Sequence, residues 1–203
     1  MSVTCDIHVL CLNEPADALA KCIQSVEHPA LSVHLLAGIS GQIGLARKNG
    51  YMLGDAPYVS SCDPDDTYDK DVLLHMIDIL NDNPDTGLVY SGENIVEGSR
   101  THYHFNPFDA KAILRTPMAC HGVIVFRRNL IESAFPGLVY FKYKYERWFS
   151  SLFAHFSGHR IIGVDMPGRT WNRHSGQTSQ KISNFDTRLI RRFIASRSLL
   201  RML

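Results

Sequence analysis

The stretch that decides the fold is YVSSCDPDDT, residues 58–67, in which a run suited to a buried strand passes directly into an acidic turn. We predict a strand over residues 58–62, followed within four positions by Asp63, Asp65 and Asp66. Open α/β sheets bind their ligands just past the carboxyl ends of strands. The acidic turn therefore stands where such a protein would hold a ligand.

The segments on either side of this turn alternate between strand-like and helix-like patterns. Apolar runs at 7–12 and 31–36 predict strands, and the apolar steps of three and four residues between them predict a helix. Strand, helix, strand in this order implies parallel pairing. Further strands are expected at 87–91, 122–126 and 160–164, and further helices at 44–54, from the turn to Asn83, at 145–156 and at 185–203. The chain is thus predicted to be α/β, with a mostly parallel central sheet flanked by helices.

Composition narrows the class of protein. The chain has 203 residues, 45% of them hydrophobic, and 21 Lys plus Arg against 20 Asp plus Glu, which suits a globular domain without a global attraction to nucleic acid or membrane. The five cysteines show no C-x-x-C spacing, so reduced thiols and a cytoplasmic setting are expected. Neither a secretion signal nor an apolar run of about 18 residues is present in the sequence.

The acidic turn itself has two interpretations. Clustered carboxylates repel one another unless they are solvated or bind a cation, and Mg²⁺ or Mn²⁺ takes such oxygen ligands. A metal held there would bridge to a diphosphate. Alternatively, the turn is a solvated loop in which Asp66 or Thr67 caps the following helix.

Together with the segments on either side of it, the acidic turn resembles the motifs of the family 2 glycosyltransferases of the GT-A fold. GLARKNG at 44–50, the strand at 58–62 and the D-x-D-D turn resemble a run of motifs in that family. The segment from Asn13 to Val26, the FRRN run at 126–129, ERW at 146–148, Gly158 and RHS at 173–175 agree with it in order. The resemblance covers residues from the first strand to about Ser179, and implies a GT-A-type Rossmann-like sandwich.

The resemblance implies an inverting transfer of a sugar from a nucleotide-sugar donor to an acceptor hydroxyl, dependent on Mn²⁺ or Mg²⁺. Asp65 is expected to bind the metal, with Asp63 sharing it or lying near the donor ribose, and Asp66 serving as a helix cap. His174 resembles a position that completes the metal shell. Asn13 and Arg47 are expected to lie at the donor site, where Arg47 would contact the diphosphate or else be an ordinary arginine on a helix surface.

The sequence departs from the family pattern at two places. The family carries a Glu-Asp pair whose second acid is the catalytic base, but here Glu146 is followed by Arg147. Glu146 is therefore the expected base, and its alternative role is an exposed helix carboxylate paired with a neighbouring cation. The acidic residue that reads the nucleotide base is also missing from residues 37–41, so the sequence leaves the nucleotide open.

Two histidines outside this pattern, His102 and His104, alternate in a strand-like run and could share one face. We interpret them as structural because no carboxylate or cysteine lies close to them in the sequence.

Two other classes of protein remain as alternatives. D-x-D-x-T at 63–67 also matches the nucleophile loop of haloacid-dehalogenase-type phosphatases, although there the motif follows the first strand. A binding module that kept the fold and lost catalysis would explain Arg147 at the position of the base.

The C-terminal segment indicates how the chain divides into domains and which partners it contacts. We expect a glycosyltransferase domain over 1–183, with a donor half at about 1–95 and an acceptor half at about 96–183, and a basic amphipathic helix over 184–203. Its arginines would contact an anionic membrane surface on the cytoplasmic side, or nucleic acid, or the helix would dock its apolar face on the domain. A glycan or lipid-linked acceptor is expected before a modified nucleic-acid base.

Overall fold

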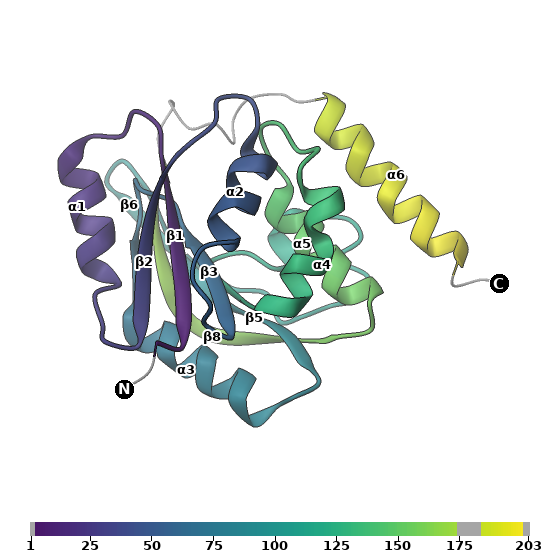
Figure 1. Ribbon diagram of the computed structural model, residues 1–203, viewed down its shortest axis with the longest axis horizontal. Coiled ribbons are helices and arrows are strands. Elements are labelled where there is room, and N and C mark those ends of the chain that lie inside the picture. The colour runs from purple at the N-terminus through teal and green to yellow at the C-terminus, as the bar shows by residue number, and fades with distance from the viewer. Residues whose placement is uncertain (1–2, 174–183, 201–203) are drawn as a thin grey trace.

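The computed structural model describes residues 3–173 and 184–200, and its centre is an eight-stranded sheet (Figure 1). The strands are β1 (Cys5–Cys11), β2 (Leu31–Ala37), β3 (Tyr58–Cys62), β4 (Thr67–Tyr68), β5 (Thr86–Glu97), β6 (Arg100–His104), β7 (Ile124–Arg127) and β8 (Arg160–Arg173). Their order across the sheet is β2-β1-β3-β7-β5-β8-β4, and β6 pairs with β5 outside this path.

The sheet is mixed in direction. β1 is parallel to β2 and β3, and β5 is parallel to β8, whereas β7 runs antiparallel to both β3 and β5. Five strands therefore point one way, and β4, β6 and β7 point the other. β5 turns back into the antiparallel β6, and β7 then has the same direction as β6 and pairs with the earlier part of β5.

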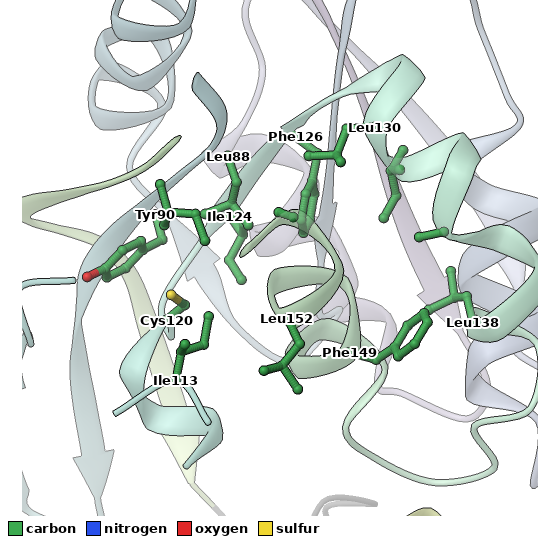
Figure 2. Close-up of a cluster of buried hydrophobic side chains, with 14 of the residues drawn as sticks. Leu88, Tyr90, Ile113, Cys120, Ile124, Phe126, Leu130, Leu138, Phe149 and Leu152 are labelled. Carbon is green, nitrogen blue, oxygen red and sulfur yellow. The ribbon is translucent and has the colours of Figure 1, made fainter. Parts of the chain in front are cut away.

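Helices cover both faces of this sheet, which confirms the predicted α/β class (Figure 1). They are α1 (Ala16–Ser25), α2 (Ile43–Tyr51), α3 (Lys70–Asp82), α4 (Arg128–Leu138), α5 (Glu146–Phe156) and α6 (Asn184–Leu200), with a 3₁₀ turn at Pro117–Ala119. α1 and α3 pack in one hydrophobic cluster, and α2, α4 and α5 pack in the other. Figure 2 shows the second cluster, in which side chains of α4 and α5 meet those of β5 and β7. None of the helices within residues 3–173 and 184–200 is long and apolar enough to cross a bilayer.

The start of α3 corrects one prediction about the acidic turn. Asp69, not Asp66 or Thr67, is the N-cap residue, and its carboxylate accepts from the backbone N–H groups of Asp71 and Val72. Asp66 is 1% exposed and is used elsewhere. The predicted end of this helix near Asn83 and the stop of α5 before Gly158 are confirmed.

α6 docks its apolar side on the domain, which was one of the three alternatives predicted for the C-terminal helix. Phe193 contacts the rings of Phe149 and Phe156 on α5, at centroid distances of 4.8 and 5.7 Å. The buried carboxylate of Asp186 accepts from three consecutive backbone N–H groups at residues 142–144. The exposed side of the helix carries Arg188, Arg191, Arg192 and Arg197.

Candidate functional site

The acidic turn begins where β3 ends, so Asp63 lies at the carboxyl edge of the sheet as predicted. β1 is parallel to β3 and also ends at this edge, which brings the loop that contains Asn13 to the same side of the molecule. Asn13 is exposed, and its backbone N–H donates to the carboxylate of Glu14 at 3.1 Å.

Three arginines converge on the carboxylate of Asp63. Nη2 of Arg47 and Nη2 of Arg147 lie 2.5 and 2.7 Å from Oδ1, and Nη2 of Arg169 lies 3.4 Å from Oδ2. Burial would raise the pKa of Asp63, but the three guanidinium groups outweigh it and hold that pKa well below its usual range. Asp63 is therefore ionised at pH 7.

Arg47 is buried inside this network rather than lying on a helix surface. It is 3% exposed, and its other two nitrogens face Nε2 of His8 at 3.3 Å and Oε1 of Glu146 at 3.5 Å. Burial lowers the pKa of His8 well below its ordinary value, and the neighbouring arginines lower it further, so the neutral ring can accept from Arg47. The structure thus brings Arg47, Asp63 and Glu146 together, and Glu146 is 8% exposed rather than solvated.

The rest of the acidic turn is attached to β8. Oδ2 of Asp66 pairs with Nη2 of Arg169 at 2.8 Å and Nε at 3.0 Å, and Oδ1 accepts from the backbone N–H of Asn172. The side-chain amide of Asn172 donates to the backbone carbonyl of Asp65 at 2.9 Å. These contacts hold the half-buried Asp65 at a defined place beside Asp63.

The predicted metal ligands differ in how well they suit a cation. Both oxygens of Asp63 face guanidinium groups, so this carboxylate does not fit direct ligation of a metal in this arrangement. Asp65 fits, since Mg²⁺ commonly uses one or two carboxylates together with substrate phosphates and water. His174 lies outside the described residues, and within those residues no group of three or more His, Cys, Asp or Glu side chains is arranged to hold a metal.

A second polar cluster lies next to this network, and the sequence analysis did not identify it. Glu93 of β5 is fully buried, and its Oε1 accepts a short hydrogen bond from Nδ1 of His121. Nδ1 of His104 lies 3.8 Å from the same oxygen, and Nε of Arg169 lies 3.9 Å from Oε2. The carboxylate that seemed to be missing near His104 thus comes from the neighbouring strand, because β5 and β6 pair with Glu93 opposite His104.

The conformation of the backbone directly before β7 requires a glycine. Gly122 has φ +73°, and a Cβ on it would lie 2.4 Å from the carbonyl oxygen of Ser91. No other residue fits this close approach between β7 and β5, so the glycine determines where His121 stands. The glycine was the one signal in the sequence that could have singled out His121.

The fold is similar to that of TarS from S. aureus. The crystal structure of TarS 1–349 in complex with UDP-GlcNAc matches 96% of this chain with a TM-score of 0.73 at 14% sequence identity. The structure of TarS 1–349 in complex with UDP matches the same share at a TM-score of 0.64 and 14% identity. The chain spans 66% and 65% of these two structures and 39% of a longer TarS structure, with which it has a TM-score of 0.68.

No protein-family model and no curated protein sequence matches the chain. The similarity to TarS lies in the fold, since 14% identity carries no information about individual residues. The match covers the mixed sheet and the helices on both of its faces. The chain therefore has the GT-A glycosyltransferase fold that the resemblance in its sequence predicts.

Proposed function

We propose that this protein is a glycosyltransferase that transfers a sugar, with inversion, from a nucleotide-sugar donor to an acceptor hydroxyl. The observation that carries the proposal is the convergence of Arg47, Arg147 and Arg169 on Asp63 at the carboxyl edge of the sheet. Burying so many charges costs stability compared with apolar side chains, and such clusters gather at functional sites. The same fold in TarS has been crystallised with UDP-GlcNAc and with UDP, which supports a nucleotide-sugar donor here.

Arg147 is the arginine best suited to meet the donor diphosphate. Its Nε is buried and has no hydrogen-bond partner among the described residues, whereas Arg47 uses all three nitrogens within the protein. The side chain of Arg147 is also 19% exposed, against 4% for that of Arg47, so a phosphate oxygen can approach its guanidinium. We assign Arg147 to the diphosphate, Arg47 to holding Asp63 in place, and the exposed Asn13 to the rim of the donor site.

We propose that Asp65 holds Mg²⁺ or Mn²⁺ when the donor is bound. The cation would neutralise the charge that develops on the leaving diphosphate. Asp63 then acts as the counter-charge for the arginines and lies towards the ribose, and His174 remains a predicted further ligand.

The role of Glu146 follows from its contacts. Its carboxylate is buried and faces Nε of Arg47, which in turn binds Asp63. This geometry favours a positioning role for Glu146, acting through Arg47, over the role of catalytic base that the sequence suggested. A phosphatase that uses Asp63 as nucleophile is disfavoured by the same network, because both carboxylate oxygens already face arginines.

We further propose a glycan or lipid-linked acceptor, reached from the cytoplasmic side of a membrane. The exposed arginines of α6 would provide the contact with anionic lipid, since each basic side chain near such a surface contributes about 1 kcal/mol. Co-sedimentation with vesicles containing phosphatidylserine, compared with binding to duplex DNA across a salt series, tests this. DNA binding that weakens steeply with salt, without vesicle binding, would favour the nucleic-acid acceptor.

The donor proposal is tested by thermal unfolding with a panel of UDP-, GDP- and dTDP-sugars, each with Mg²⁺, Mn²⁺ or a chelator. A donor at 100 times its dissociation constant should stabilise the protein by about 2.7 kcal/mol, only when the metal is present. Asp65→Asn should abolish this metal-dependent shift, whereas Asp78→Asn, an exposed change in α3, should keep it. If no donor stabilises the protein, the proposed function is wrong. Binding without any release of nucleoside diphosphate would instead identify a non-catalytic binding module.

A further inference from the structure

The proposed reaction needs a group that takes a proton from the acceptor, and the acidic side chains near the turn are poorly placed for it. Arg147 stands where the family pattern has its second acid, and a guanidinium does not accept a proton in proteins. Glu146 is buried against Arg47. Asp63 and Asp66 are both engaged by arginines. The base must therefore come from another part of the edge.

The strand registers bring a histidine to this place. Val125 of β7 lies opposite residues of both β3 and β5, and β7 runs antiparallel to each. β3 ends directly before Asp63 and β7 begins three residues after His121, so this register brings the segment before β7 to the carboxyl ends of β3 and β5. The hydrogen bond between His121 and Glu93 agrees with this register.

Arg169 connects this pair to the proposed donor site. Its Nη2 lies 3.4 Å from Oδ2 of Asp63, and its Nε lies 3.9 Å from Oε2 of Glu93. One guanidinium thus spans the two carboxylates. His121 is consequently connected to the acidic turn through Glu93 and Arg169, although 58 positions separate it from Asp63 in the sequence.

The contact with Glu93 determines which nitrogen of His121 is available. Nδ1 donates to the carboxylate, so in the neutral ring Nε2 carries the lone pair. Nε2 has no hydrogen-bond partner within the described part of the chain, and 24% of the side chain is exposed, whereas that of Glu93 is fully buried. A buried carboxylate behind a partly exposed imidazole is the arrangement of a histidine general base.

We propose that His121 is the catalytic base of this protein and that Glu93 positions it; this rests on the function proposed above. Nε2 takes the proton of the acceptor hydroxyl while the acceptor oxygen forms a bond to the anomeric carbon of the donor. The bond from that carbon to the diphosphate breaks, and its electron pair leaves with the nucleoside diphosphate. The resulting imidazolium faces the negative charge of Glu93 and later releases its proton to water.

The charges around the ring suit this role. Glu93 from β5 accepts from His121, the ring of His104 from β6 lies 6.5 Å away between centroids, and the charges of Arg169 from β8 and Arg147 from α5 also act on the ring. Burial lowers the pKa of His121, the hydrogen bond and charge of Glu93 raise it, and the two arginines lower it, with a net decrease from the ordinary value. The ring is therefore neutral and able to accept a proton at pH 7.

The test uses release of nucleoside diphosphate from the sugar nucleotide that binds in the panel above, with water as the acceptor. His121→Asn should lower turnover by about 100-fold or more, leave donor affinity unchanged, and remove the fall in rate on the acid side of the pH profile. Added imidazole should restore part of the turnover of His121→Ala. His102→Asn, which alters the exposed histidine of β6, is the matched control and should keep wild-type turnover.

The outcomes separate this inference from the proposed function. Turnover within about twofold of wild type in His121→Asn, or an unchanged acid limb, overturns the role of His121 while the glycosyltransferase proposal stands. If Glu146→Gln loses turnover and its acid limb while His121→Asn does not, Glu146 is the base. A wild-type protein that binds no donor, or binds it without turnover, overturns both proposals.

Discussion

Nη2 of Arg147 donates to Oδ1 of Asp63 at 2.7 Å, although the sequence resemblance aligns Arg147 with the position of a catalytic base. The two residues are 84 positions apart in the sequence. The pair joins the start of α5 to the end of β3. The contact therefore gives Arg147 a role in balancing the charge of the acidic turn.

Arg147→Gln should destabilise the protein by about 1 to 3 kcal/mol. The change removes one of three cations facing a carboxylate that is only 28% exposed, although Arg47 and Arg169 remain in contact with it. Urea unfolding measures the difference in the free energy of unfolding. Lys21→Gln, which breaks an exposed pair with Asp17, should have an effect below about 1 kcal/mol, and equal effects of the two changes would contradict the prediction.

The stability of the wild-type protein should decrease as the pH falls below about 4. The pKa of Asp63 is lowered in the folded state, below an unfolded value of about 3.9, so the carboxylate stabilises the fold above that pH. This contribution disappears as the pH falls towards the folded pKa. Melting temperatures between pH 3 and 7 should follow a flatter curve in Asp63→Asn than in wild type. Asp17→Asn, an exposed control, should leave the shape of the curve unchanged.

Glu93→Gln should move the acid limb of the pH–rate profile to lower pH and decrease turnover. The carboxylate raises the pKa of His121 through its hydrogen bond and charge, so its removal allows the arginines and burial to lower that pKa further. Measurement of turnover from pH 4.5 to 8 gives the position of the limb. A purely structural role of Glu93 predicts lower stability with the limb in its wild-type position.

Asp186→Ala should cost about 2 to 4 kcal/mol and loosen α6. Its buried carboxylate accepts hydrogen bonds from the backbone N–H groups of residues 142–144, and these groups would lose a charged acceptor. Hydrogen exchange should show faster exchange in α6 and in the loop before α5, with less change in β1 and β3. Asp78→Ala, on the exposed face of α3, is the control and should leave both the stability and the exchange of α6 close to wild type.

The sequence by itself predicted most of the helices and strands, but the predicted elements include neither α4 nor β4. The bounds predicted for β3, β2 and α5 agree with the structure to within one residue, because burial on one side and turn residues at the ends are local properties. β5 and β8 extend well beyond the predicted 87–91 and 160–164. Their later halves contain polar residues such as Glu93 and Asn172 and become strands only because they pair with each other across bulges.

The same division holds for the candidate site. The acidic turn was visible in the sequence because its three aspartates are neighbours in the chain, and Asp63 and Asp65 lie at the predicted edge. Its partners were not visible, because Arg147 and Arg169 reach Asp63 from α5 and β8, and Glu93 meets His121 only through strand pairing. A local pattern can show where a charged turn lies. Only the tertiary structure decides which distant charges make its burial possible, since pairing of buried charges depends on distance in space.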